Sequence, residues 1–296
     1  MKKAYIYAGI AILLWSSLAT VSKMLLGSLS SYQVLWVSAL FAALALLVVS
    51  VGTGRAKVMK QYRLRDYGIM VAIGLPGSFV YYVLYFLGTA RLQASQAFTI
   101  NYLWPIMSVV FACILLGEKM TLRKGVAIGL SFLGVVTVAG SGLANFSPST
   151  LVGVLLVVGA AVSYGAFTAL NQKWHYDKYI SLMVSFFATF VLSLLIQLLS
   201  GKPMELNVLQ LAGMGWNGIA VMAVATVCWA LALDMGDTAK ISNLAYITPF
   251  LSLVWTFLIL KEAIDPWSVA GLGIIVLGIF IQLKDNNRNG QLTIDN

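Results

Sequence analysis

The chain has 296 residues, of which 60% are hydrophobic and 10% charged, and its mean hydropathy is +0.90. Soluble domains usually carry about 25% charged residues, so this composition excludes an ordinary soluble domain and predicts an all-α membrane protein with several bilayer crossings. The net charge of +9 comes mainly from basic residues in short segments between apolar runs, where they set membrane topology, so nucleic acid is not an expected partner.

Ten apolar runs are long enough to cross a bilayer, which takes about 20 residues in a helix. In chain order we expect transmembrane helices over residues 4–26, 32–52, 66–90, 95–116, 122–141, 149–172, 179–199, 209–233, 240–260 and 265–284. The polar residues 285–296 have no hydrophobic periodicity and are predicted to form a disordered cytoplasmic tail.

Basic residues are distributed unevenly between the two sets of loops. If the N-terminus is cytoplasmic, fifteen lysines and arginines lie on that side and three on the other. Cytoplasmic loops are enriched in lysine and arginine. We therefore expect both termini to be cytoplasmic, in a multi-pass protein of a bacterial inner membrane.

The sequence also repeats itself at a constant offset of 144 residues. Proline, glutamate and two glycines keep this register over one continuous stretch: Pro105 with Pro249, Glu118 with Glu262, Gly129 with Gly273 and Gly134 with Gly278. Such a register indicates an internal repeat. We expect one five-helix repeat over residues 1–144 and a second over 145–284. Because five is odd, the second repeat is inverted, an arrangement typical of secondary transporters that work by alternating access.

The stretch Asn101-Tyr102-Leu103-Trp104-Pro105 interrupts the fourth apolar run. Proline removes a backbone donor and bends a helix. We therefore expect Pro105 and its equivalent Pro249 to act as paired hinges, with freed carbonyls at Asn101 and Ala245 facing a cavity. Ordinary kinks that improve packing are the alternative.

Several aromatic side chains lie too deep in the membrane for an interfacial belt. At 1.5 Å per residue, those of the third and fourth runs lie about 10–14 Å below the surface. Their hydroxyl and indole groups need polar partners there, which favours a central cavity for a small solute over simple packing between helices. With Asn101, the candidate substrate-binding residues are Trp15, Tyr81, Tyr82, Tyr85, Tyr102, Trp104, Tyr164 and Tyr246.

The remaining ionisable residues favour structural roles. Glu118 and Glu262 end the fourth and ninth runs, and we expect each to pair with a neighbouring helix. Coupling of transport to protons is the alternative role. Lys23 lies near the outer end of the first run, where it either extends to the surface or meets a substrate carboxylate. Cys113 and Cys228 are expected to be buried free thiols.

No enzyme motif is present, and neither a metal nor a cofactor is expected. Glycines instead recur at helical spacing in the fifth and tenth runs. Small residues let membrane helices approach closely. We therefore expect a contact between these two runs, formed by Gly125, Gly129, Gly134, Gly271, Gly273 and Gly278.

Together, Trp15-Ser16, the block from Pro105 to Gly134 and its copy from Pro249 to Gly278 resemble the drug/metabolite transporter superfamily, in its ten-helix branch of two EamA repeats. The Asn101–Pro105 stretch is similar to aromatic amino acid exporters of the YddG type. This resemblance implies a basket of helices around a central cavity, with the fifth and tenth spans outside it. It also implies a cavity lined from spans one, three, four and six, by Trp15, Tyr81, Tyr82, Tyr85, Tyr102, Trp104 and Tyr164.

The sequence therefore predicts a monomeric or homodimeric transporter in the lipid bilayer that exports amino acids, aromatic ones included, or related small metabolites. Import of choline-like quaternary amines and broad drug/metabolite export are the alternatives on the same fold. A membrane enzyme or a scaffold is the rival of another class.

Overall fold

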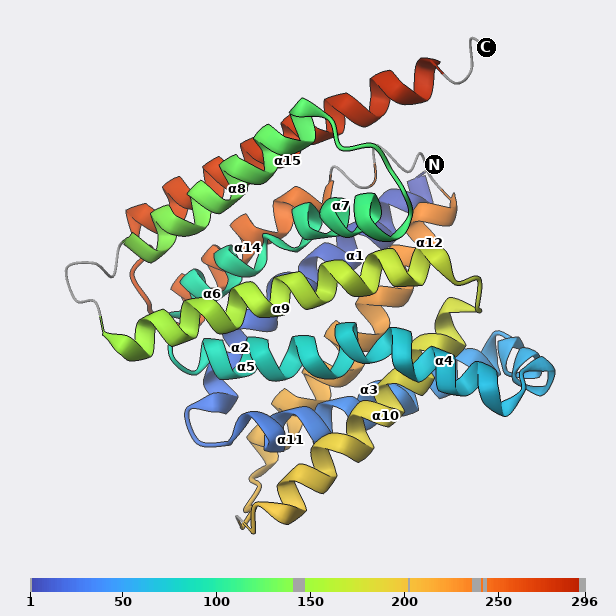
Figure 1. The fold of residues 1–296 in the computed structure, drawn as a ribbon. Coiled ribbons are helices and arrows are strands. Elements are labelled where there is room, and N and C mark those ends of the chain that lie inside the picture. The colour runs from blue at the N-terminus through green and yellow to red at the C-terminus, as the bar shows by residue number, and fades with distance from the viewer. Residues whose placement is uncertain (1, 141–146, 202, 236–240, 242–243, 293–296) are drawn as a thin grey trace.

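The computed structural model describes residues 2–140, 147–201, 203–235, 241 and 244–292. Over these residues the chain forms helices and no strands (Figure 1). The elements are α1 (Lys2–Ser16), α2 (Leu18–Leu26), α3 (Ser31–Gly52), the 3₁₀ helix η1 (Arg55–Gln61), α4 (Leu64–Leu75), the π-helix η2 (Pro76–Val80), α5 (Tyr81–Thr89), α6 (Ala94–Asn101), α7 (Trp104–Leu115), α8 (Leu122–Gly140), α9 (Pro148–Lys173), α10 (Lys178–Leu199), α11 (Val208–Gly215), the π-helix η4 (Trp216–Val224), α12 (Ala225–Met235), the 3₁₀ helix η5 (Ala245–Ile247), α14 (Thr248–Trp255), the π-helix η6 (Thr256–Leu260) and α15 (Pro266–Leu292).

These elements follow the predicted membrane spans and confirm an all-helical membrane protein. Seven helical stretches of the described chain are long and apolar enough to cross a membrane, and residues 245–260 and 266–281 form shorter apolar helices. The structure differs at the C-terminus, where α15 continues to Leu292 although a disordered tail was expected from residue 285. An existing helix is extended at little cost, because each added residue gains a backbone hydrogen bond. Residues 293–296 lie outside the described residues.

The internal repeat is visible in where the helices begin. α4 begins at Leu64 and α11 at Val208, α5 at Tyr81 and α12 at Ala225, α7 at Trp104 and α14 at Thr248, and α8 at Leu122 and α15 at Pro266. Each pair is separated by the offset found in the sequence. The interruptions of the helices therefore repeat along with the residues.

The first helices of the two repeats are exchanged. α9, which opens the second repeat, packs against α4, η2, α5, α6 and α7 of the first, whereas α1 packs against η4, α12 and α14 of the second. We call the first set the α9 group and the second set, completed by α2, α11, η5 and η6, the α1 group. α3 and α10 pack against each other. The described chain therefore does not divide in space into an N-terminal and a C-terminal half.

α8 and α15 lie side by side along one edge of the molecule (Figure 1). A Cβ atom at Gly134 or Gly271 would lie 2.7 or 2.6 Å from the carbonyl oxygen of the other residue, and one at Gly278 would lie 2.8 Å from the Ala127 carbonyl oxygen. The predicted contact between these helices is confirmed. Gly125, Gly129 and Gly273 were wrongly assigned to it, because no atom of another helix lies within 4 Å of a Cβ atom built at these positions.

This difference between glycines of the same helix can be tested. Gly271→Ala places a methyl group against the backbone of α8, so we expect it to lower the free energy of unfolding by about 1–3 kcal/mol. Gly273→Ala is the matched control and should leave stability within about 0.5 kcal/mol of the parent. Thermal unfolding in detergent measures both, and equal effects of the two substitutions would contradict this packing.

Candidate functional site

Five of the predicted aromatic side chains come together between α5, α7 and α9. The ring of Tyr81 lies 4.7 Å from that of Tyr82, 5.8 Å from that of Tyr85 and 4.9 Å from that of Tyr164. Trp104 meets Tyr164 edge to face at 5.2 Å. We call these five residues the aromatic cluster. Its tyrosines on α5 are buried, whereas Trp104 and Tyr164 are only half-buried. The exposed surface of the cluster is therefore formed mainly by these two side chains.

Asn101 adds a polar group to the aromatic cluster. Its side-chain amide donates a hydrogen bond of 3.0 Å to the hydroxyl of Tyr81. The amide oxygen is buried and has no hydrogen-bond partner within the described protein. A buried acceptor without a partner is costly, so this oxygen can accept a hydrogen bond from a donor that the chain itself does not supply.

The π-helix η2 positions the tyrosines of α5. It begins at Pro76, whose carbonyl accepts a hydrogen bond of 2.7 Å from the Ser163 hydroxyl of α9. A Cβ atom at Gly77 would lie 2.3 Å from the ring of Phe167, so the two helices meet here through a glycine. A π-turn is wider than an α-turn and shifts the register of the residues that follow. Residue patterns alone revealed neither η2 nor the contact with Ser163.

Tyr102 lies in the break between α6 and α7 and connects the two groups of helices. Its hydroxyl donates a hydrogen bond to the backbone carbonyl of Ala245. Ala245 lies four residues before Pro249, which has no N–H to offer this carbonyl. The Ala245 carbonyl, which was expected to be free, therefore has a partner: it accepts a hydrogen bond from Tyr102 in the equivalent break of the other repeat.

The two prolines lie in the first turns of α7 and α14 rather than inside continuous helices. The sequence predicted bends, but the structure has breaks. Proline is well accommodated in a first turn, because the N–H that it lacks would have no partner within the helix. Pro105 and Pro249 remain candidates for hinges at these two breaks.

Trp15 and Tyr246 have ring partners outside the aromatic cluster. Trp15 packs against Trp229 of α12 with ring centroids 5.4 Å apart, and Tyr246 packs against Phe280 of α15 at 5.3 Å. The structure therefore divides the nine predicted residues into the aromatic cluster with Asn101, the bridging Tyr102, and two residues at other contacts of the α1 group.

Two tryptophans that sequence reasoning missed stabilise the break between α1 and α2. The indole of Trp255 donates a hydrogen bond to the Ser16 hydroxyl, and that of Trp216 donates one to the Ser17 hydroxyl, each 2.9 Å long. Both tryptophans come from the second repeat. An indole N–H inside a predicted span needs an acceptor, and that was the available signal.

Lys23 joins α2 to the predicted outer end of α5. Its ammonium group donates to the backbone carbonyls of Thr89, at 2.9 Å, and Leu92. Carbonyls at the C-terminal end of a helix carry partial negative charge, so a lysine is stabilised there. In this conformation the Lys23 ammonium group is bound by these carbonyls, so it is neither free at the surface nor free to meet a substrate carboxylate.

Glu262 and Glu118 are equivalent in the repeat but have different partners. The carboxylate of Glu262 accepts a hydrogen bond of 3.0 Å from the backbone N–H of Ala94, at the start of α6. Glu118 forms a 2.9 Å ion pair with Lys124 of α8. Pairing of both carboxylates with a neighbouring helix is confirmed, but only Glu262 connects the α1 group to the α9 group.

Near Glu118, the side chain of Cys113 is half-buried, although it was expected to be buried. Its sulfur lies 3.8 Å from the Lys124 ammonium.

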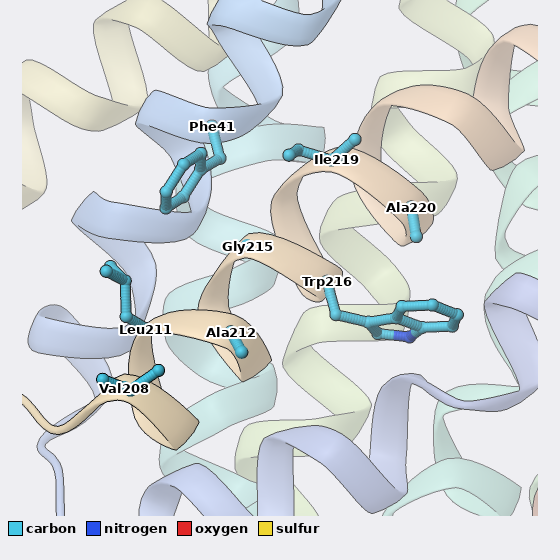
Figure 2. Close-up of a pocket in the computed structure, with 8 residues that line it drawn as sticks. All are labelled: Phe41, Val208, Leu211, Ala212, Gly215, Trp216, Ile219 and Ala220. Carbon is cyan, nitrogen blue, oxygen red and sulfur yellow. The ribbon is translucent and has the colours of Figure 1, made fainter.

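The structure also contains an apolar groove, of about 580 Å³, between α3, α11 and η4. Figure 2 shows its lining, with the rings of Phe41 and Trp216 beside small and aliphatic residues. Its lining residues include none of the predicted site residues. Val208, Leu211 and Ile219 are exposed apolar side chains on helices that cross the membrane, so contact with lipid tails explains this groove.

Equivalent helical repeats, interrupted helices and buried polar groups at the interruptions define the architecture of a secondary transporter. The chain belongs to the EamA-like transporter family, whose sequence model matches residues 2–140 and again residues 151–283. It is therefore a multi-pass membrane transporter and not an enzyme.

Relatives over most of the chain include transporters with named substrates. An uncharacterized transporter of Clostridium kluyveri is 26% identical, over 99% of this chain and 96% of its own. A probable terminal-alkyne amino-acid exporter of Streptantibioticus cattleyicolor is 27% identical, over 86% and 85%. The aromatic amino acid exporter YddG of Ancylobacter novellus is 27% identical, over 82% and 83%. A crystal structure 19% identical to this chain, with a TM-score of 0.68, covers 97% of this chain and 99% of its own and supports the fold.

The hydrogen bond from Tyr102 to Ala245 can be tested, with the equivalent tyrosine of the other repeat as the control. Tyr102→Phe removes the hydrogen bond to Ala245 and leaves a carbonyl without a donor, so we expect a loss of about 0.5–1.5 kcal/mol in unfolding free energy. Tyr246→Phe, at the equivalent position, should change stability much less, because Tyr246 packs through its ring. Thermal unfolding in detergent distinguishes the two, and the reverse order would show that the bridge is unimportant.

Proposed function

We propose that this transporter exports amino acids, aromatic ones included, or related small metabolites by alternating access. The observation that carries the proposal is the aromatic cluster with the unpaired amide oxygen of Asn101. Ring faces and edges suit an apolar or planar side chain, while the amide oxygen suits an ammonium donor. An amino acid combines both features. Two relatives whose names state amino acid export support the same substrate class.

Because α1 packs against the second repeat and α9 against the first, the rigid units that move in this proposal are not the two repeats. The moving units are the α1 group and the α9 group, each drawn from both repeats, rather than residues 1–144 against residues 145–284. Tyr102, Lys23 and Glu262 connect the two groups. The breaks before Pro105 and Pro249 give each group an interrupted helix at the same depth, where it can bend.

The same contacts support a conformation closed at its outer end. Lys23 and Glu262 both act there, on the end of α5 and the start of α6. At the other end of the fourth span, Glu118 pairs with Lys124 of the adjacent α8 and not with the α1 group. We therefore assign to Lys23 and Glu262 the role of an outer gate, which opens when substrate is released.

We further propose that the protein resides in a bacterial inner membrane with both termini cytoplasmic. Helices α1 and α15 have their free ends at the same end of the molecule, where the N and C labels lie in Figure 1. The excess of basic residues in the loops assigns that end to the cytoplasm. The second repeat is then inverted relative to the first, and the functional unit is a monomer or a homodimer.

Counterflow in proteoliposomes tests the substrate class. Vesicles loaded with unlabelled aromatic amino acid should accumulate the labelled compound, and vesicles loaded with choline should not. Accumulation with choline alone would replace the proposal with the amine importer, and accumulation with many unrelated drugs would favour a broad exporter. No flux for any of them would favour a role other than transport of these solutes.

The aromatic cluster is tested by Trp104→Ala. We expect at least a tenfold loss of counterflow, because the half-buried indole forms the accessible side of the cluster, while thermal stability changes little. Trp267→Ala, an exposed tryptophan at the start of α15, should retain the parental rate. Normal counterflow by Trp104→Ala would remove this residue from the site.

The outer gate is tested by Glu262→Ala. In a chain with Cys113→Ser, Cys228→Ser and Ser95→Cys, the buried cysteine at position 95 reports opening at the start of α6. We expect Glu262→Ala to raise its rate of reaction with an impermeant thiol reagent severalfold, because the start of α6 loses its acceptor. Glu118→Ala should not change that rate. Unaltered labelling in Glu262→Ala would contradict the gate.

A further inference from the structure

The short segment between α3 and α4, together with the first turn of α4, presents cations that the substrate site does not use. Lys57, Lys60, Arg63 and Arg65 are all exposed. We call them the basic patch. Among the described residues, both ion pairs of the structure involve other cations, so no described carboxylate lies within 4.0 Å of a side-chain nitrogen of the patch. Figure 1 shows this segment at the edge of the molecule, beyond α4.

The helix type aligns two of these charges. η1 is a 3₁₀ helix, and side chains three residues apart in such a helix eclipse each other. Lys57 and Lys60 therefore point to the same side, and Arg63 follows the helix in an extended conformation. Like charges held this close repel each other, and an anion bound between them would offset the repulsion.

Contacts made by other residues of η1, and by Tyr62 just after it, hold the patch in place. The Arg55 guanidinium forms a 2.8 Å ion pair with Asp177 and lies 4.2 Å from the centroid of the Tyr179 ring. The Asp177 N–H donates to the Tyr62 hydroxyl at 2.9 Å, and the Tyr67 hydroxyl donates to the Met59 carbonyl at 2.9 Å. A site whose geometry is fixed before binding loses less entropy when it binds.

The Tyr176 hydroxyl completes this support by donating a 3.2 Å hydrogen bond to Asp66. Partial burial and then this hydrogen bond raise the pKa of the Tyr176 phenol. The phenol therefore remains a donor at neutral pH. Asp66 also accepts from the Arg63 N–H at 2.7 Å, which attaches the end of the patch to the start of α4.

The position of the patch relative to the bilayer identifies its ligand. α3 ends at Gly52 and α4 begins at Leu64, and both belong to helices that cross the membrane. A connection this short keeps the four cations at the level of the lipid headgroups. We propose that the basic patch binds the phosphate headgroup of an anionic phospholipid, such as phosphatidylglycerol. Each such cation near an anionic surface contributes about 1 kcal/mol.

Thermal unfolding of the purified full-length protein in detergent, with added phosphatidylglycerol or phosphatidylcholine, tests the proposal. Phosphatidylglycerol should raise the midpoint, and phosphatidylcholine should not. In Lys57→Gln/Lys60→Gln the half-effective concentration of phosphatidylglycerol should rise roughly thirtyfold, from two such contributions. Lys119→Gln/Arg123→Gln, in another basic loop, should respond like the parent.

Three outcomes would overturn the proposal: equal stabilisation by both lipids, an unchanged response in Lys57→Gln/Lys60→Gln, or full stabilisation by inorganic phosphate without lipid. If that double variant is recovered poorly, Lys57→Gln alone is compared with Lys119→Gln in the same titration. An unchanged response in Lys57→Gln then counts against the patch.

Discussion

The structure depends on the requirement that backbone polar groups inside a bilayer find partners within the protein. An uninterrupted helix meets that requirement by itself, but this chain is interrupted in several of its spans. Each interruption therefore needs a side-chain donor. At the break between α1 and α2, the hydroxyls of Ser16 and Ser17 donate to the Leu13 and Leu14 carbonyls and accept from the indoles of Trp255 and Trp216. At the other breaks, the Ser163 hydroxyl donates to the Pro76 carbonyl and the Tyr102 hydroxyl to that of Ala245. These polar contacts join the helices around the aromatic cluster and fix the relative positions of the breaks.

The glutamates of the repeat illustrate how equivalent residues acquire different partners. Both follow an interrupted span, and the sequence around them is similar. Glu262 accepts a hydrogen bond from the backbone N–H at the start of α6, whereas Glu118 pairs with Lys124 on its own side of the molecule. The two repeats have related sequences, but their equivalent glutamates make different contacts, so the two ends of the molecule differ. Alternating access requires such asymmetry, because a transporter with equal ends would be open or closed at both.

Much of the fold could be predicted because its signals are local. Hydropathy located the spans, and the register of Pro105 with Pro249 located equivalent breaks. Contacts between segments that are distant in the sequence were harder to predict. Periodicity does not reveal that α1 packs against the second repeat, and it does not distinguish Gly134, which faces α15, from Gly129, which does not. The aromatic cluster was predicted from depth alone, but depth could not separate Tyr81 and Tyr164 from Trp15, since the helices that carry them pack against different partners.

The exchange of first helices also constrains how the chain matures. α1 and α2 are synthesised first and enter the membrane first, yet their packing partners α12 and α14 belong to the last part of the chain. Until residues 216 and 255 have been inserted, the hydroxyls of Ser16 and Ser17 lack the indoles that bind them in the finished protein. During this time each hydroxyl is bonded within the first span, to the Leu13 or Leu14 carbonyl, but the span lacks these contacts to other helices. The packing of the first span is therefore complete only after the ninth span, which carries Trp255, has entered the membrane.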